Sequence, residues 1–371
     1  MNLSYWEIQT WLSNVDYTII GSGIVGLNCA LQLKKRFPKA KIVIIEKGIL
    51  PQGASTKNAG FACFGSLSEI IDDLKQHSEA EVLELIRKRI NGLKILREIL
   101  GDKTINYQNL GGYELFLESD DTLYNSCLNT KDKINQLLYP IFNTDVFSFK
   151  TNNFGFKNIK SDYSFNPFEG QIDTGKMMDT LLNKVQSLGV KILNNTAIDV
   201  FSEDTSTVKI KTKHFEFSTQ KLFIATNGFA KQLKISEVKP ARAQVLITKP
   251  IENLHVKGTF HLDEGYYYFR NIDHRILLGG GRHLDFRTEE TTAFGETPII
   301  QNKLEELLKT TILPNTAFEI DHRWSGIMGV GKQKKAIVKQ ISNHVFCGVR
   351  LGGMGVAIGS LVGRELADLV E

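Results

Sequence analysis

The chain has 371 residues, of which 42% are hydrophobic and 23% charged, and its formal net charge is +4. This composition is that of an ordinary globular protein, and the length favours two domains over a single core. No dense basic run favours a nucleic-acid partner, no apolar stretch is long enough to predict a membrane span, and residues 1–14 lack the pattern of a secretory signal. We therefore expect a cytoplasmic protein without nucleic-acid partners.

The first predicted unit is a strand, a tight turn, a helix and a second strand. Residues 17–20 are an apolar run, GSGIVG at residues 21–26 has G-x-G-x-x-G spacing, and a helical pattern and a second apolar run lead to Glu46. In such a unit the glycines allow the turn, the approach of the backbone to a pyrophosphate, and close helix packing. A carboxylate at Glu46 accepts hydrogen bonds from ribose hydroxyls and repels a 2′-phosphate, which favours FAD or NAD over NADP. The alternative is a glycine-rich turn in another α/β fold.

The next segment, residues 47–66, is broken up by glycines and is predicted to lie against the cofactor. Ser66 with Glu69, and Ser78 with Glu81, have the spacing of capping boxes. In a capping box the serine and the glutamate each satisfy a backbone N–H at the start of a helix. The sequence therefore predicts two helices that begin after residues 66 and 78.

The pattern then changes twice along the chain. Strands are predicted at 105–117, around a pair of glycines, and a helix at 123–141, where a second domain begins. The α/β pattern returns with a helix at 174–188 and strands up to residue 225. Residues 238–323 again indicate the second domain, as strands with one helix at 298–312.

The C-terminal region is predicted as a strand, a glycine-rich loop (RLGGMG) and a helix that begins near Gly355. Gly355, Gly359 and Gly363 recur every fourth residue, so they share one helix face and permit very close packing. The positive end of this helix is a second place where a helix dipole can meet negative charge.

Five motifs, in this order, resemble the D-amino-acid oxidase-like FAD-dependent oxidoreductases. They are GSGIVG with Glu46, GASTKNAG (53–60), IATNG (224–228), RWSGIMGV (323–330) and GVRLGGMGVAIG (348–359). The resemblance covers nearly the whole chain and is nearest the γ-glutamylputrescine oxidase branch, in the group with glycine oxidase and sarcosine oxidase. It implies an α/β fold: a Rossmann-like FAD-binding domain of the glutathione reductase type and an α+β substrate domain on a mainly antiparallel sheet. The expected FAD-binding domain comprises residues 1–100, 169–235 and 324–371, and the substrate domain residues 101–168 and 236–323.

The resemblance implies FAD with its pyrophosphate on the first glycine loop and its isoalloxazine ring between the GAS-type loop and the C-terminal glycine loop. The cofactor residues that it implies are Gly21, Ser22, Gly23, Ile24, Val25, Gly26, Glu46, Lys47, Ala54, Ser55, Lys57, Asn58, Ala59, Gly60, Ile198, Ala225, Thr226, Asn227, Gly228, Gly348, Gly352, Gly353, Met354 and Gly355. Non-covalent binding is expected, because covalently flavinylated relatives carry a histidine or cysteine in motifs that lack them here. A thioether at Cys63 is the alternative.

Four residues are candidates for contact with the substrate. Arg270 and Arg350 offer bidentate guanidinium groups for a substrate carboxylate, although each could be a structural or surface arginine. Tyr268 and its neighbour Tyr267 point to opposite sides of a strand, so at most one faces the pocket. Lys57 is either a flavin neighbour or a solvated charge.

The implied reaction is oxidation of the C–N bond of an amino acid or amine to an imine, by hydride transfer to flavin N5, with oxygen or another electron acceptor. Relatives that bind an α-amino-acid carboxylate often have arginine where this chain has Met328, and some oxidases carry a lysine in the strand matching residues 275–279, which has none. The alternatives are an FAD dehydrogenase for a hydroxy acid and a flavoprotein that binds FAD as a sensor or without catalysis. No metal site is expected, because the four cysteines form no C-x-x-C pair.

Overall fold

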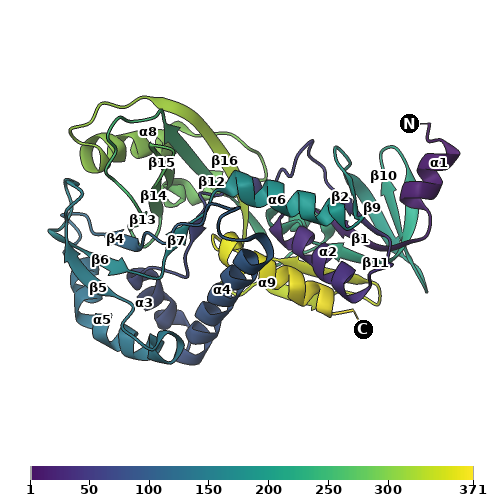
Figure 1. Cartoon of the computed structure of the whole chain (residues 1–371), viewed down its shortest axis with the longest axis horizontal. Helices are drawn as coiled ribbons and strands as arrows, with labels where there is room; N and C mark the ends of the chain where they lie inside the picture. The colour runs from purple at the N-terminus through teal and green to yellow at the C-terminus, as the bar shows by residue number, and fades with distance from the viewer. Residues whose placement is uncertain (1, 371) are drawn as a thin grey trace.

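The computed structural model describes residues 2–370, which form two eight-stranded sheets and a small two-stranded one (Figure 1). The first large sheet has the order β17-β18-β11-β1-β2-β8, with β10 and β9 continuing beside β11. The strands β18, β11, β1, β2 and β8 run parallel to one another, and β17 pairs antiparallel with β18 at the edge. Its strands are β1 (Val15–Ile20), β2 (Ile42–Ile45), β8 (Lys191–Leu193), β9 (Ile198–Glu203), β10 (Val208–Thr212), β11 (Glu216–Ile224), β17 (Ile337–Gln340) and β18 (Val345–Val349). All four residues of β2 are buried, as a parallel sheet covered on both faces requires.

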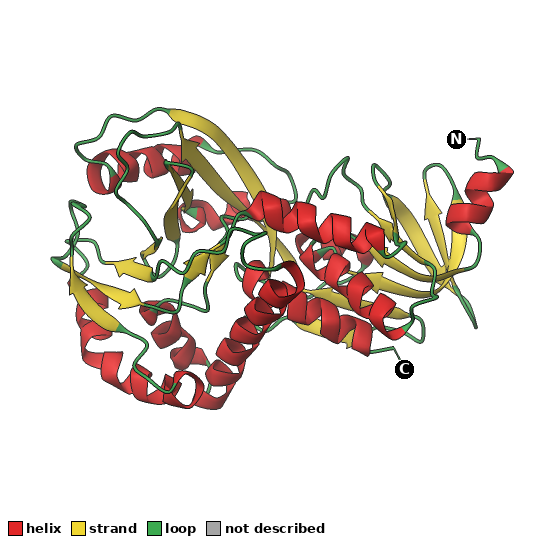
Figure 2. Ribbon diagram, viewed as in Figure 1, coloured by secondary structure: helices red, strands yellow, loops and turns green. Residues whose placement is uncertain are grey.

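Helices gather between the two large sheets (Figure 2). They include α2 (Ile24–Arg36), α4 (Glu79–Leu100), α6 (Thr174–Ser187) and α9 (Gly355–Asp368). The predicted close packing is confirmed for Gly359 and Gly363, because a Cβ on Gly363 would lie 2.6 Å from the carbonyl oxygen of Val25 in α2; a Cβ on Gly355 would have no neighbour closer than 3.8 Å. On the other side of α9, a Cβ on Gly92 of α4 would lie 2.1 Å from the Ala357 carbonyl oxygen. The three helices can therefore approach this closely only with glycine at these contacts.

The second large sheet has the order β16-β12-β15-β14-β13-β4-β6-β5 and is antiparallel except for the pair β13 and β4. Its strands are β4 (Gly112–Leu115), β5 (Ser148–Thr151), β6 (Asp162–Asn166), β12 (Lys239–Thr248), β13 (Thr259–Leu262), β14 (Tyr267–Ile272), β15 (Arg275–Gly280) and β16 (Ile320–Val330). Leu246, Phe269 and Leu278 pack on α8 (Pro298–Leu307) in one core cluster. Since side chains alternate along a strand, their neighbours point to the opposite face, toward the first sheet.

The remaining elements are α1 (Tyr5–Glu7), η1 (Ile8–Leu12), η2 (Ala54–Thr56), β3 (Phe61–Ala62), α3 (Leu67–Gln76), α5 (Asp121–Phe142), β7 (Gly170–Gln171), η3 (Asn227–Leu233), η4 (Arg282–Asp285), α7 (Phe286–Glu289) and η5 (Leu308–Ile312). Both predicted capping boxes are confirmed, at the starts of α3 and α4. Within residues 2–370, no helix combines the length and the apolar character that crossing a membrane requires.

The α/β fold class is confirmed, whereas two details differ from the sequence analysis. Of residues 105–117, only those of β4 lie in the second large sheet. Gln108, which precedes β4, instead forms an isolated bridge with Gln171. Residue 324, expected to open the last FAD-binding segment, lies inside β16, which pairs with β12 along its length. We therefore propose that the substrate domain extends to Val330.

Candidate active site

A cavity of about 550 Å³ is bordered by elements of both large sheets. Most of the predicted cofactor residues line it: Gly21, Gly23, Ile24, Val25, Glu46, Lys47, Ala54, Ser55, Lys57, Asn58, Ala59, Gly60, Ile198, Ala225, Thr226, Asn227, Gly352, Gly353, Met354 and Gly355. These residues come from six separate parts of the chain. The fold thus brings the predicted motifs together around one space.

Four predicted cofactor residues lie behind the cavity wall instead, namely Ser22, Gly26, Gly228 and Gly348. A Cβ on Gly26 would lie 2.0 Å from the carbonyl oxygen of Gly21, so this glycine allows α2 to pack on the turn. Ser22 is fully buried. The cofactor contacts expected of these four residues stay predictions, and for Gly26 the packing of the backbone is a further role.

The carboxylate of Glu46 organises one end of the cavity. Its Oε2 accepts hydrogen bonds from the backbone N–H of Ser22 (3.1 Å) and from the Ser22 hydroxyl (2.8 Å), and its Oε1 accepts from the Gly48 N–H (2.9 Å). The first turn of α2 lies beside it, and the N–H groups of Val25 and Gly26 have no acceptor among residues 2–370. Free N–H groups at a helix start favour an anion, so this end of the cavity fits the pyrophosphate of a dinucleotide.

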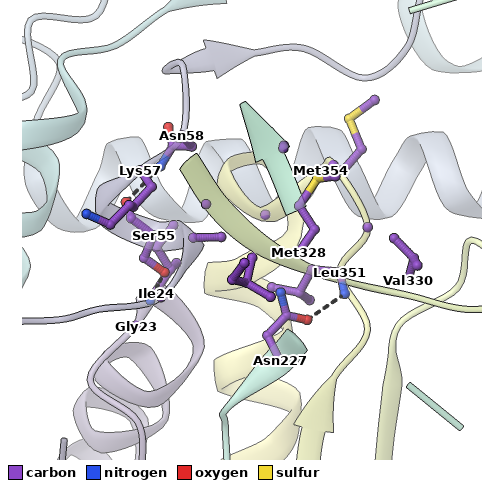
Figure 3. Close-up of a pocket in the computed structure, with 18 of the residues that line it drawn as sticks. Gly23, Ile24, Ser55, Lys57, Asn58, Asn227, Met328, Val330, Leu351 and Met354 are labelled. Atoms are coloured by element: carbon purple, nitrogen blue, oxygen red, sulfur yellow. Dashed lines mark hydrogen bonds between the residues drawn. The ribbon is translucent and has the colours of Figure 1, made fainter. Parts of the chain in front are cut away.

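The GAS-type loop is tied to the first glycine loop and to itself (Figure 3). Ser55 Oγ accepts a hydrogen bond from the Ile24 N–H at 2.9 Å. The Asn58 amide donates to the Ser55 carbonyl oxygen (2.7 Å), and its oxygen accepts from the Gly60 N–H (2.8 Å). From the second sheet, the Trp324 indole N–H donates to the carbonyl oxygen of Lys57 at 3.0 Å. The loop is therefore held from both domains.

Asn227 fixes the C-terminal glycine loop from below (Figure 3). Its side-chain oxygen accepts hydrogen bonds from the backbone N–H groups of Arg350 (3.0 Å) and Leu351 (3.2 Å). The loop then leads into α9, and the N–H of Gly355 at its first turn has no acceptor among residues 2–370. Backbone donors therefore border the cavity at this end as well.

One cross-strand row of the second sheet borders the cavity through Val245, Tyr268 and His261. The register aligns Trp324, Val245, Gly279, Tyr268 and His261 on five neighbouring strands. A Cβ on Gly279 would lie 2.7 Å from the ring atoms of Tyr268, so the phenol ring lies over this glycine. Burial raises the pKa of Tyr268 to about 12, which keeps its hydroxyl protonated at neutral pH. Tyr268 can therefore serve as a hydrogen-bond donor but not as a base.

His261 continues the row as a buried ion pair. Its Nε2 lies 3.0 Å from Glu169 Oε2, which also accepts a hydrogen bond from Thr259 (3.1 Å). Burial by itself lowers the pKa of His261, but the charge of Glu169 and their hydrogen bond outweigh it and raise the pKa to about 9. Cys63 completes a group of three potential metal ligands within 4.8 Å of one another. Because Glu169 Oε2 is already engaged twice, the group is better described as an ion pair than as a metal site.

The four residues predicted to contact the substrate divide into two groups. Tyr268 and Lys57 line the cavity. Arg270 does not: it is 3% exposed and its Nε donates to the carbonyl oxygen of Ala59, so it braces the GAS-type loop from behind. Arg350 also points away, with its Nε donating to the Lys335 carbonyl oxygen at 2.9 Å. Both arginines therefore hold loops in place through backbone carbonyl oxygens, and neither lines the cavity.

Several lining residues were not predicted from the sequence, among them Tyr266, Arg282, Met328 and Leu351 as cavity walls and His261 in the buried pair. One of them carried a readable signal: Arg282 follows three glycines at the end of a strand pattern, and glycine in a strand often marks a site that a ligand approaches closely. The others are brought to the cavity by strand register, which the sequence does not reveal.

Known proteins share this fold. The curated "Probable oxidoreductase OrdL" of Haemophilus influenzae is 21% identical over 393 residues, with 97% of this chain and 84% of that protein covered. Glycine oxidase from Geobacillus kaustophilus superposes with a TM-score of 0.77 at 18% identity, covering 96% of this chain and 94% of the other. Iminodiacetate oxidase from Chelativorans sp. BNC1 gives a TM-score of 0.76 at 16% identity, covering 95% of both chains.

A family model described as FAD dependent oxidoreductase (DAO) matches residues 16–369. That match includes both glycine loops, the GAS-type loop and the cavity face of the second sheet. Its cofactor, FAD, agrees with the free N–H groups at the starts of α2 and α9 and with the cavity between them. The chain therefore belongs to the FAD-dependent oxidoreductase family and is an enzyme of that family.

Proposed function

We propose that this enzyme oxidises the C–N bond of an amino acid or amine to an imine, which water then hydrolyses. Bound FAD supplies the two-electron acceptor, with hydride passing to N5 of its ring. Solved neighbours support this class of substrate: they include an L-proline dehydrogenase from P. horikoshii (TM-score 0.75, 18% identity, 96% and 93% of the two chains), beside the glycine and iminodiacetate oxidases. Those substrates belong to those proteins, and their shared amine chemistry motivates the proposal here.

The observation that carries the proposal is the aromatic and apolar face that the second sheet presents to the cavity. Tyr268 and Val245 of this sheet share one row, and Phe61 of the neighbouring strand β3 meets Tyr268 edge to face with ring centroids 5.6 Å apart. Such surroundings disfavour a charged ammonium and so lower the pKa of a bound amine. A neutral amine is the form that can release hydride from the neighbouring carbon, so no dedicated base is required. Because the pKa of Tyr268 is raised by burial, its hydroxyl orients the substrate as a donor.

The opposite wall supplies backbone donors. Gly353, Met354 and Gly355 line the cavity where α9 begins. When FAD is bound, preorganised N–H groups of this kind would stabilise negative charge on its ring. The loop needs no rearrangement for this role, because Asn227 already fixes the preceding residues.

We also propose that FAD is held without a covalent bond. Cys63 lines the cavity, but burial raises the pKa of its thiol well above the ordinary value, so the nucleophilic thiolate is scarce. Acid precipitation should leave the yellow colour in the supernatant; colour in the pellet would point to attachment at Cys63.

Anaerobic bleaching of the flavin absorbance by a panel of amines, amino acids and hydroxy acids tests the reaction. Reduction by an amine or amino acid is expected, and ammonia or an amine product should appear in equal amount. Bleaching by hydroxy acids alone would make the enzyme a hydroxy-acid dehydrogenase. Bleaching by dithionite but by no panel member would favour a non-catalytic flavoprotein. Admitting air after reduction then tells whether oxygen is the electron acceptor.

A further inference from the structure

Arg282 is the first residue of η4, directly after the strand β15 that forms the cavity face. It lines the cavity together with Gly280 and Tyr266. Gly281 before it has φ 78°, a left-handed conformation that turns the chain out of the strand. The Arg282 guanidinium carbon lies 4.6 Å from the centroid of the Phe286 ring. A guanidinium stacked on a ring keeps its N–H edges free to donate.

The charge of Arg282 has no partner. Among residues 2–370, no carboxylate lies within ion-pair distance of its guanidinium, and no acceptor is hydrogen-bonded to it. Burial lowers the pKa of Arg282, and the group still carries its charge at neutral pH because its ordinary value is 12.5. A half-buried charge without a partner is unfavourable, so an anion that enters the cavity gains from meeting it.

The other cations of the cavity wall are engaged or differently placed. Lys334 is paired with Asp73 at 2.5 Å, and the Lys47 ammonium lies 3.5 Å from the centroid of the Phe229 ring. His261 is paired with Glu169, as described above. The rival is Lys57, which also lacks a carboxylate partner among residues 2–370; its ammonium lies 5.7 Å from the centroid of the Phe294 ring.

The segment that carries Arg282 is held rigidly from below. Glu289, at the end of α7, forms a bidentate ion pair with Arg242 of β12 at 2.7 and 2.8 Å, and it accepts a third bond from Gln244 at 3.0 Å. Glu289 is fully buried, and Gln244 also bonds Thr297 on the other side of α7. Arg282 is thus presented by an anchored segment, which lowers the entropy cost of binding a ligand.

We infer that the substrate carries a carboxylate and that Arg282 binds it. The inference rests on the proposed function, because it names the substrate class of the same cavity. A planar carboxylate matches the guanidinium fork and accepts two parallel N–H bonds. This role takes the place of the one expected for Arg270 and Arg350, whose side chains lie outside the cavity wall.

Carboxylate binding can be measured separately from catalysis. FAD-loaded protein is titrated with benzoate, and with neutral benzamide as the matched probe, while the visible flavin spectrum reports binding. We expect benzoate to bind at least about tenfold more tightly than benzamide, and Arg282→Met to weaken benzoate by about tenfold or more, the size of a lost charge-assisted bond. Arg282→Lys keeps the charge without the fork and should lose less. Arg287→Met, an exposed arginine of the same segment, should change benzoate affinity less than twofold.

The outcomes separate this inference from the proposed function. Equal affinity of the wild type for benzoate and benzamide, or unchanged benzoate affinity in Arg282→Met, would overturn it. A loss in Lys57→Met with none in Arg282→Met would transfer the role to Lys57 and would also overturn it. If amines without a carboxylate bleach the flavin as fast as their carboxylated counterparts, the inference fails and the amine oxidation stands. If carboxylates bind through Arg282 but nothing bleaches the flavin, carboxylate binding at Arg282 stands and the proposed amine oxidation fails. Flavin content and thermal melting verify that each variant is folded. Should Arg282→Met not fold, the affinities of the wild type for benzoate and benzamide decide whether the cavity binds a carboxylate.

Discussion

The two ends of the cavity are built on different principles. At the dinucleotide end, main-chain groups of consecutive residues face the cavity, and the side chains nearby, such as those of Glu46 and Ser55, hold the loops in place. At the substrate end, residues of five neighbouring strands lie in one row of the second sheet, four of them with side chains and one a glycine. The first arrangement is specified by local spacing and the second by strand register.

This difference determines what a substitution does. A change at the dinucleotide end acts on the path of the backbone, because the critical residues are glycines packed against carbonyl oxygens. A change at the substrate end acts on charge and contact, and its cost depends on the buried partners of the side chain. The predictions below test whether the two ends respond in these two ways.

The largest effect is expected at the support of the substrate end. Glu289→Gln keeps the shape but leaves Arg242, whose side chain is 9% exposed, as a buried charge without a partner. Breaking one side of a buried ion pair costs about 3–5 kcal/mol. We expect this loss in the free energy of unfolding, measured by urea denaturation at neutral pH. The matched control is Glu319→Gln, which breaks the exposed pair with Lys249 and should cost about 1 kcal/mol or less. Similar losses in both variants would contradict the buried network.

At the dinucleotide end, Gly26→Ala should cost about 3 kcal/mol and yield protein largely without FAD. Its Cβ would lie 2.0 Å from the Gly21 carbonyl oxygen, so α2 and the turn must move apart. Gly23→Ala should be milder, because the atom that its Cβ meets, at 2.8 Å, is the Ser55 hydroxyl, which can rotate. Gly53→Ala is the control for thermal melting only, since no protein atom lies within 4 Å of its Cβ but the residue lines the cavity. Thermal melting ranks the three and flavin-to-protein stoichiometry the first two; a ranking with Gly23→Ala as the worst would show that direct cofactor contact outweighs backbone packing.

The ion pair at the substrate end predicts a dependence on pH. The pKa of His261 is raised from 6.5 to about 9, so its stabilising contribution is complete below the unfolded value and is lost as pH rises through about 9. His261→Gln lacks this contribution, with an expected loss on the order of 2 kcal/mol at neutral pH. The wild type should therefore be the more stable protein at pH 7, and its advantage should shrink toward pH 10. A constant difference across this range would mean that His261 is neutral in the folded protein.

Sequence reasoning succeeded where structure follows from local signals. The strand, glycine turn and helix of the first unit and the two capping boxes all depend on residues within a few positions of each other. The fold class followed from their order, because alternating strands and helices specify a parallel sheet. The expected helix at 298–312 is α8 with its continuation η5.

The parts that could not be predicted depend on contacts between distant residues. Nothing near Arg270 in the sequence indicates that its guanidinium donates to the Ala59 carbonyl oxygen. Nothing near Arg282 indicates that its guanidinium has no ion-pair partner among residues 2–370. The position of Tyr268 requires Gly279 on the neighbouring strand, a pairing that only the register fixes. The sequence therefore identified the type of side chain needed at the substrate end but not the residue that supplies it.

The smallest effect is expected at Glu46, where both principles meet. Its carboxylate holds Ser22 and Gly48 and borders the cavity beside Ile198, so it has a part in the loop and, as we propose, a part in binding the ribose. Glu46→Gln should weaken FAD binding about tenfold, because charge-assisted hydrogen bonds lost to a neutral amide are worth on the order of 1–2 kcal/mol. It should also lower the melting temperature of the apoprotein, since one end of the amide then faces backbone donors.

The control for Glu46 is Ser22→Ala, which removes the hydroxyl bond of 2.8 Å and leaves the carboxylate in place. We expect it to cost about 1 kcal/mol in the apoprotein, the ordinary value of a hydrogen bond, and to change FAD affinity less than about threefold. The FAD that each variant retains after dialysis measures its affinity for the cofactor, and thermal melting of the flavin-free protein measures the stability of the loop. If Glu46→Gln lowers the melting temperature and retains full FAD affinity, the carboxylate serves the loop alone, and the adenosine end is recognised by the backbone without it.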